Sequence, residues 1–177
     1  MVYVLLADGF EEVEAIEPID ILKRGGVEVT TVGVTGKVVT GAHGIPVTAD
    51  IEIQDIQPED MELLMLPGGA GHELLDASNE VHALINYAVA NNLYISAICA
   101  APSILGKKQI LDGKNAVCFP GYEKYLYGAV ISDEKAVTDG KIITAKGAGA
   151  AAEFGFSMLT VLKNRETADK IKEIMQY

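Results

Sequence analysis

Cys99 is the residue whose surroundings most suggest chemistry. It follows the apolar run from Leu93 to Ile98, which predicts a buried parallel strand, and it precedes Pro102-Ser103-Ile104-Leu105, which predicts the start of a helix. A cysteine on the sharp turn between a strand and a helix is a nucleophile elbow, with its sulfur directed outward. The helix start would favour the thiolate over the thiol. The alternative is that Cys99 is a small buried apolar residue, as most free cysteines are.

Glu14 is the expected partner of Cys99. It lies in Glu11-Glu12-Val13-Glu14, just beyond the carboxyl end of a predicted strand at 2–6. Glu11 and Glu12 are expected to be solvated and to complement the helix dipole. Glu14 is one residue from Val13 and two residues from Ile16, so we expect its side chain to point toward the core and the rim of the sheet. If protonated, it would donate a hydrogen bond to the Cys99 thiolate and exchange a proton with a substrate.

Gly68 and Gly69 follow a third predicted strand and are expected to contribute to the same site as Cys99 and Glu14. Glycine lets the backbone turn tightly and bring bare N–H groups close to a ligand. The Gly69 N–H, together with the Ala100 N–H, is predicted to form an oxyanion hole for an adduct on Cys99. The alternative is an ordinary turn between a strand and a helix.

The elements that must position these residues alternate along the chain. Strands are predicted at 2–6, 27–33, 63–66, 93–98 and 116–119, and helices at 12–24, 78–91, 150–162 and 166–176. A hairpin is predicted around Asp139-Gly140, and the glycine-rich segment 35–50 is predicted to form an edge hairpin or extension. The alternation predicts one α/β domain over residues 1–177, with a mostly parallel sheet and helices on both faces. The three strand ends that carry the candidate residues would then meet at one rim.

The net charge, the cysteines and the lengths of the apolar runs exclude several classes of protein. The formal net charge of −11 argues against a nucleic-acid or anionic-membrane partner, because both would repel the chain. Its two cysteines, Cys99 and Cys118, form no C-x-x-C motif, and Cys118 is expected to be inert core. No signal peptide or membrane-spanning run is recognisable, so we expect a soluble, cytoplasmic protein.

Four motifs together resemble a known family. They are Glu11-Glu12-Val13-Glu14, Leu66-Pro67-Gly68-Gly69, Ala97-Ile98-Cys99-Ala100-Ala101-Pro102, and Gly147-Ala148-Gly149 with Glu153-Phe154. By these motifs the chain resembles the ThiJ/PfpI superfamily over essentially its whole length. Within it, the match is to the branch of the parkinsonism-associated protein deglycase and its bacterial relatives. The resemblance implies a flavodoxin-like three-layer sandwich, a homodimer, no cofactor, Cys99 as the nucleophile and Glu14 as its acidic partner.

The histidines depart from the pattern of that superfamily. Many members carry a histidine near the cysteine where this chain has Phe119, and protease-type members have one in the place of Ala100. Phe119 and Pro120 are predicted to wall the pocket. His43 is a candidate to reach the site, either of its own subunit or of a partner subunit. His72 is expected to start a helix, with a place near the rim as the alternative, and His82 is expected at the surface. Their spacing supports no metal site.

The resemblance, together with these residues, implies three candidate functions. The first is a cofactor-free glyoxalase or deglycase that acts on 2-oxoaldehydes such as methylglyoxal and glyoxal, or on their protein and nucleotide adducts. The second is a non-enzymatic redox sensor or chaperone that works through oxidation of Cys99. The third is a cysteine peptidase or amidotransferase-like hydrolase, which would need a histidine base in a His-x-Glu arrangement that this sequence lacks.

Overall fold

A seven-stranded sheet forms the centre of the protein. The computed structural model describes residues 1–177. The strands lie in the order β10-β11-β7-β6-β1-β2-β5, and every neighbouring pair is parallel except the hairpin of β10 and β11. Their bounds are β1 Val2–Leu6, β2 Val29–Gly33, β5 Ile51–Glu52, β6 Leu63–Leu66, β7 Tyr94–Ile98, β10 Ala136–Asp139 and β11 Ile142–Ala145. The predicted α/β architecture with a mostly parallel sheet is confirmed.

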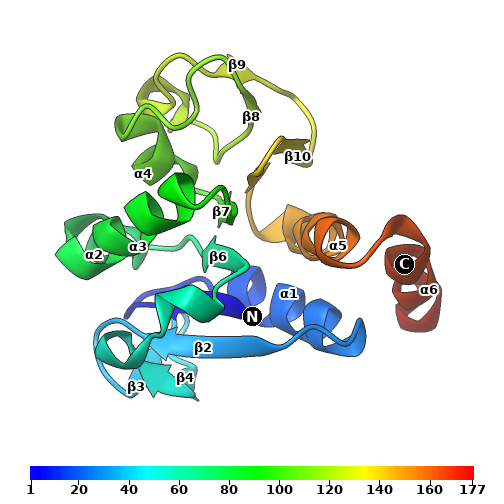
Figure 1. Cartoon of the computed structure of the whole chain (residues 1–177), viewed down its shortest axis with the longest axis horizontal. Coiled ribbons are helices and arrows are strands. Elements are labelled where there is room, and N and C mark those ends of the chain that lie inside the picture. The colour runs from blue at the N-terminus through cyan, green and yellow to red at the C-terminus, as the bar shows by residue number, and fades with distance from the viewer.

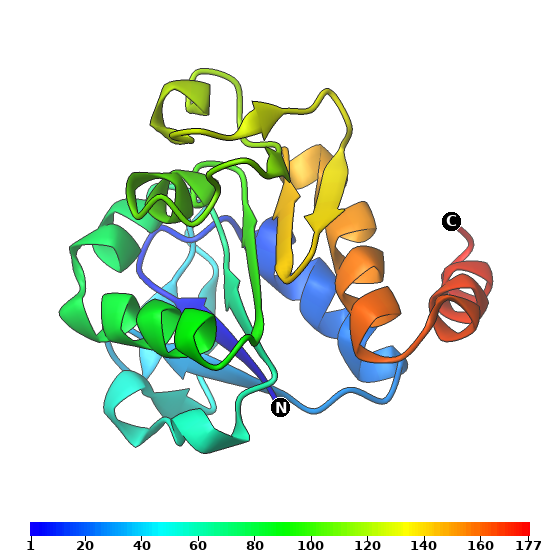
Figure 2. The same ribbon diagram turned by 45° about the horizontal axis from the view of Figure 1, so that its top comes forward.

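Helices cover both faces of this sheet and make three layers. The helices are α1 Glu12–Arg24, α2 His72–Ala77, α3 Asn79–Ala90, α4 Pro102–Lys107, α5 Ala151–Leu162 and α6 Arg165–Met175. Figures 1 and 2 show α2, α3 and α4 on one side of the strands and α1 and α5 on the other. The α6 helix packs outside α5 and carries the C-terminus.

The apolar residues of the strands divide into two cores. Alternate residues of one strand point to opposite faces of a sheet. Val2, Val4 and Leu6 accordingly join the core beneath α1 and α5, while Tyr3 and Leu5 join the core beneath α3 and α4. All five residues of β1 are buried, as expected for a central parallel strand.

A small hairpin lies against the rim where β1 meets α1. It consists of β3 Val38–Thr40 and β4 Pro46–Thr48, which pair antiparallel, so the predicted hairpin in 35–50 is confirmed. The Gly9 N–H donates to the Thr40 carbonyl, and the Ala42 N–H donates to the Phe10 carbonyl. These bonds hold the hairpin against the loop that leads into α1.

Some local predictions need correction. The short strand predicted at 116–119 is β8 Asn115–Ala116, which pairs with β9 Val130–Ile131 in a separate sheet, while Val117 donates its N–H to the Thr144 side chain. The strands predicted at 27–33 and 93–98 begin later, at Val29 and Tyr94.

The predicted capping of α3 by Ser78 is confirmed, because its hydroxyl accepts the Val81 N–H. Short 3-10 turns complete the fold at Ile53–Asp55, Pro58–Asp60, Glu123–Tyr125 and Ala148–Ala150. No helix of the protein is both long enough and apolar enough to cross a membrane.

We predict that Gly106→Ala destabilises the protein. Gly106 lies in α4, where an added Cβ would come within 2.2 Å of the Tyr125 carbonyl oxygen and 2.6 Å of the Leu126 Cα. Both neighbours are backbone atoms, so the overpacking should lower the free energy of unfolding by about 1–3 kcal/mol despite the better helix propensity of alanine. Urea denaturation measures this change. At Gly149 an added Cβ meets nothing within 4 Å, so Gly149→Ala is the matched control. Equal stability of the two variants would contradict the prediction.

Candidate functional site

Cys99 occupies a strained turn between β7 and α4. Its φ of +65° lies in the left-handed region, which residues other than glycine rarely adopt. Two hydrogen bonds hold this conformation: the Cys99 N–H donates to the Ala145 carbonyl at 2.9 Å, and the Cys99 carbonyl accepts the Phe119 N–H at 2.8 Å. Strain of this kind persists only where neighbouring structure enforces it, and it concentrates at functional sites. The geometry is that of the predicted nucleophile elbow.

Glu14 lies beside the thiol and is almost completely buried. It comes from the first turn of α1, and only 1% of its surface is exposed. Its Oε2 accepts the Gly68 N–H at 3.0 Å, and its carboxyl group also bonds the Ala148 N–H and the Cys99 thiol. The structure therefore brings together the two residues that the sequence paired.

Burial and mutual repulsion keep protons on this pair. Burial raises the pKa of the Glu14 carboxyl to about 7, even though its contacts with Cys99 and with the Gly68 and Ala148 N–H groups lower it. Burial and the charge of Glu14 raise the pKa of the Cys99 thiol to about 12. From the sequence, the helix start was expected to favour the thiolate, and this expectation is corrected. The N–H groups of Gly69 and Ala100 lower the pKa of the thiol, but by less than burial and the charge of Glu14 raise it. Between these two pKa values the pair holds one proton, which the sulfur and the carboxylate share.

The glycines after β6 let the backbone approach both acidic groups. A Cβ on Gly68 would lie 2.4 Å from the Cys99 Cβ and 2.4 Å from the Glu14 Oε2, so no larger residue fits there. The N–H groups of Gly69 and Ala100 hydrogen-bond the Cys99 sulfur and lower the pKa of its thiol. The two donors proposed for an oxyanion hole therefore both meet this sulfur.

A hollow of about 280 Å³ opens beside the sulfur. Its walls are Gly69, Ala70, His72, Glu73, Cys99, Ala100, Phe119 and Tyr122. Phe119 thus lines the hollow as predicted. Pro120 does not, and this expectation is corrected: it sits exposed in a turn closed by the bond from the Tyr122 N–H to the Phe119 carbonyl.

His72 lies at the rim as well as at the start of a helix, the two positions that the sequence left open for it. It is the first residue of α2, as expected, but it is 7% exposed and faces the hollow of Cys99. Its Nδ1 lies 2.8 Å from the Gly69 carbonyl oxygen, and its ring packs edge-on against Tyr122 with centroids 5.4 Å apart. Its position directly after Pro67–Gly71 was the available signal.

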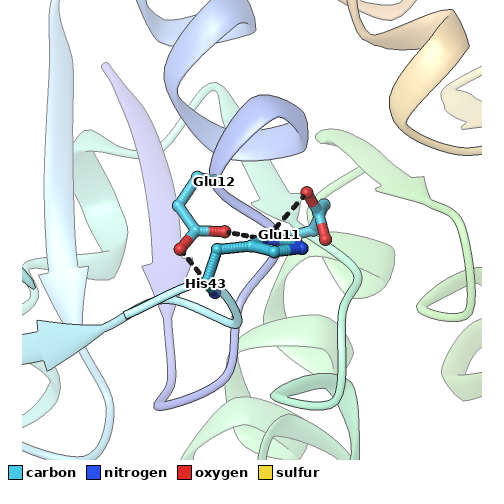
Figure 3. A group of neighbouring side chains, drawn as sticks. All are labelled: Glu11, Glu12 and His43. Carbon is cyan, nitrogen blue, oxygen red and sulfur yellow. Dashed lines mark hydrogen bonds and ion pairs between the residues drawn. The ribbon is translucent and has the colours of Figure 1, made fainter. Parts of the chain in front are cut away.

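His43 contacts Glu12 and Glu11 and does not line the hollow of Cys99. Figure 3 shows it reaching from the hairpin to the start of α1. Its Nδ1 lies 2.9 Å from a Glu12 oxygen and 3.6 Å from a Glu11 oxygen, and its N–H donates to Glu12 at 2.8 Å. These bonds hold His43 at the carboxylates, so it does not reach the hollow of its own chain. Its reach into the site of a partner subunit stays a prediction.

Glu12 was expected to be solvated, and this was wrong. Only 7% of it is exposed, because the turn of Gly41 and His43 covers it. Burial raises its pKa, but the hydrogen bonds from His43 and from backbone N–H groups outweigh burial and lower it to about 2. The donor atoms of Glu11, Glu12 and His43 lie within 4.8 Å of one another, which is close enough to share a cation. Their hydrogen bonds and ion pairs already account for the grouping.

Cys118 is separate from this chemistry. It is 2% exposed, does not line the hollow, and burial followed by the charge of Glu123 raises the pKa of its thiol to about 12. Its burial away from the hollow agrees with the expectation that Cys118 is inert core. His82 lies on α3, partly exposed, with its Nε2 at 2.7 Å from the Asp76 carbonyl oxygen.

The chain is similar to proteins of one family. The model of the DJ-1/PfpI family matches residues 1–161. DJ-1 homolog B of Arabidopsis thaliana is 34% identical over 96% of this chain, which spans 40% of the length of that protein. A deglycase of Pyrococcus abyssi is 29% identical over 84% of this chain and 90% of its own length. The solved structure of oxidized DJ-1 from Toxoplasma gondii is 32% identical, covers 99% of this chain and 97% of that chain, and has a TM-score of 0.95.

We predict that Glu14→Gln changes how stability depends on pH. The folded state raises the pKa of Glu14 from 4.5 to about 7, so between these values it binds more protons than the unfolded state does. The free energy of unfolding of the parent should therefore fall as pH rises from about 4.5 to 7, by up to about 3 kcal/mol from this residue. The glutamine side chain does not titrate, so this contribution disappears.

The measurement is urea denaturation of both proteins at several pH values. The stability of Glu14→Gln relative to the parent should increase between pH 4.5 and 7 and then level off. Glu59→Gln, which removes an exposed carboxylate, is the control and should show no such increase. A relative stability of Glu14→Gln that is flat with pH would show that burial does not hold a proton on Glu14.

Proposed function

Because the chain belongs to the DJ-1/PfpI family, we propose that it is a cysteine-dependent, cofactor-free glyoxalase or deglycase. Its substrates would be 2-oxoaldehydes such as methylglyoxal and glyoxal, or their adducts with proteins and nucleotides. The observation that carries the proposal is the contact between the Cys99 thiol and the buried Glu14 carboxyl, with the Gly69 and Ala100 N–H groups at the same sulfur. The similarity to the deglycase of Pyrococcus abyssi supports it.

The first step adds the Cys99 sulfur to the aldehyde carbon. The thiol proton passes to the aldehyde oxygen, and the product is a hemithioacetal on Cys99. The Gly69 and Ala100 N–H groups stabilise the negative charge that develops on this oxygen. A raised thiol pKa does not prevent this step, because Glu14 takes and returns the proton while the sulfur attacks.

The second step moves a proton between two carbons. The Glu14 carboxylate removes the hydrogen of the former aldehyde carbon and returns it to the neighbouring carbonyl carbon. The proton of the hemithioacetal hydroxyl passes to the oxygen of that carbonyl, which becomes a hydroxyl group. The first carbon is oxidised to a thioester while the second is reduced, so no external oxidant is needed. A carboxyl group whose pKa is about 7 suits this role, since both of its protonation states are populated near neutral pH. Water then cleaves the thioester, which releases a 2-hydroxy acid and the free thiol.

The alternative is a redox sensor, in which Cys99 becomes a sulfenic and then a sulfinic acid. The similarity to a DJ-1 structure solved in an oxidized form supports this reading. A protonated Glu14 and the Gly69 N–H would hydrogen-bond the oxidised sulfur. A sensor reacts once per oxidation, whereas an enzyme turns over repeatedly.

We also propose that the partner of this chain is a second copy of itself. Val13 and Ile16 on α1 are 45% and 42% exposed, and Ile45 of the hairpin is 55% exposed. With Met175 of α6 they border one open hollow of about 620 Å³. Exposed apolar surface of this kind is typical of an interface.

The first measurement is consumption of methylglyoxal in the absence of glutathione. We expect the parent to convert more than one equivalent, Cys99→Ser to be inactive, and Glu14→Gln to be slower by about 100-fold, the usual effect of losing an acid–base group. Cys118→Ala should keep the parent rate. No turnover by the parent would refute the enzyme and leave stoichiometric oxidation of Cys99 by peroxide as the function to test.

The dimer is tested by light scattering coupled to gel filtration. The parent should have the mass of two chains, and Ile16→Asp should reduce it to one, because a carboxylate cannot be buried unpaired in the apolar interface. Val89→Asp is the control, since Val89 is 49% exposed on α3, on the other side of the sheet. A parent that is monomeric at micromolar concentration would refute the proposal.

A further inference from the structure

One step of the proposed reaction has no residue to carry it out. Cleavage of the thioester needs a base that removes a proton from the attacking water. Glu14 is 1% exposed and does not line the hollow, so it can serve the atoms bonded to the Cys99 sulfur but not water that enters from solvent. A base for water must lie on the open side of the sulfur, in the hollow where the substrate binds.

His72 is the only imidazole that lines this hollow. Its Nδ1 lies 2.8 Å from the Gly69 carbonyl oxygen, which can only accept a hydrogen bond, so Nδ1 carries the proton. The other nitrogen, Nε2, then has a free lone pair, and no protein group donates to it. The packing against Tyr122, with the rings at 82°, fixes the orientation of the imidazole.

Gly69 forms hydrogen bonds with both His72 and Cys99. The N–H of Gly69 donates to the Cys99 sulfur, and its carbonyl oxygen accepts the His72 Nδ1–H. The histidine and the cysteine are thus held by one residue, on two walls of a hollow of about 280 Å³. The titratable groups around His72 are Glu73, Cys99 and Tyr122 in this hollow, and Asp76, Lys107, Lys124 and Tyr125 in the adjoining one.

We infer that His72 is the general base for hydrolysis of the acyl group on Cys99, an inference that rests on the proposed function for its place in the reaction. The oxygen of water forms a bond to the thioester carbon while its proton passes to Nε2. The C–S bond then breaks, and the departing sulfur takes the proton back from the imidazolium. The products are the carboxylic acid, the Cys99 thiol and neutral His72.

The test measures this step alone. Cys99 is acetylated with p-nitrophenyl acetate in a Cys118→Ala background, and loss of the acetyl group is followed by intact mass. His72→Asn keeps a donor for the Gly69 carbonyl but lacks Nε2, so its deacylation should be slower by about 100-fold. The parent should also deacylate more slowly in D₂O than in H₂O, and the variant should lose this solvent isotope effect.

Two controls separate catalysis from structure. His82→Asn removes a histidine that does not line the hollow, and it should deacylate at the parent rate. The rate at which iodoacetamide alkylates Cys99 should be the same in His72→Asn and the parent, which shows that the site is intact. With alkylation unchanged, equal deacylation rates of the parent and His72→Asn would overturn the inference.

The outcome is independent of methylglyoxal turnover. A parent that fails to consume methylglyoxal but deacylates through His72 would refute the glyoxalase and retain the base. A parent that turns over methylglyoxal while His72→Asn deacylates normally would retain the enzyme and refute the base.

Discussion

The site depends on one contact, in which a buried carboxyl group lies against a thiol. Two acids in a place of low dielectric cannot both ionise, so the pair keeps a proton over the whole neutral range. Backbone N–H groups reduce the free-energy cost of burying these two acidic groups. Gly68 and Ala148 donate to Glu14, and Gly69 and Ala100 donate to Cys99. The donors are part of the main chain, so they stay in place whichever of the two groups carries the proton.

The order of the strands explains how these groups meet. β11, β7, β6 and β1 are consecutive neighbours in the sheet, and each contributes at its carboxyl end. β1 leads to Glu14, β6 to Gly68 and Gly69, β7 to Cys99 and Ala100, and β11 to Ala148. Four adjacent parallel strands therefore place the carboxyl group of Glu14, the thiol of Cys99 and the N–H donors at a single rim. This is the edge of the sheet beyond which ligands of such folds usually bind.

The parts of the site that the sequence predicted are those set by local patterns. An apolar run followed by a helix signal located Cys99, and its distance from the end of β1 located Glu14. The burial of Glu12 was missed because it depends on the hairpin, whose contacts with the rim join residues about thirty positions apart, such as Gly9 and Thr40. The direction of the thiol pKa was missed for the same reason. The helix start is a local feature, whereas burial and the charge of Glu14 come from the tertiary fold.

This chain has Phe119 where the superfamily pattern described above has a histidine. This difference changes which groups compete for the proton of Cys99. The Phe119 backbone is fixed by its hydrogen bond to the Cys99 carbonyl, and its side chain forms an apolar wall of the hollow. An imidazole there would be a second acceptor beside the sulfur, whereas a phenyl ring leaves Glu14 as its titratable partner. The imidazole of His72 lies on a different wall, fixed by Gly69. Glu14 therefore contacts the Cys99 thiol outside the hollow, whereas His72 lies on a wall of it. In the reaction that we propose, this separation would give the proton transfer within the substrate and the later attack of water a base each.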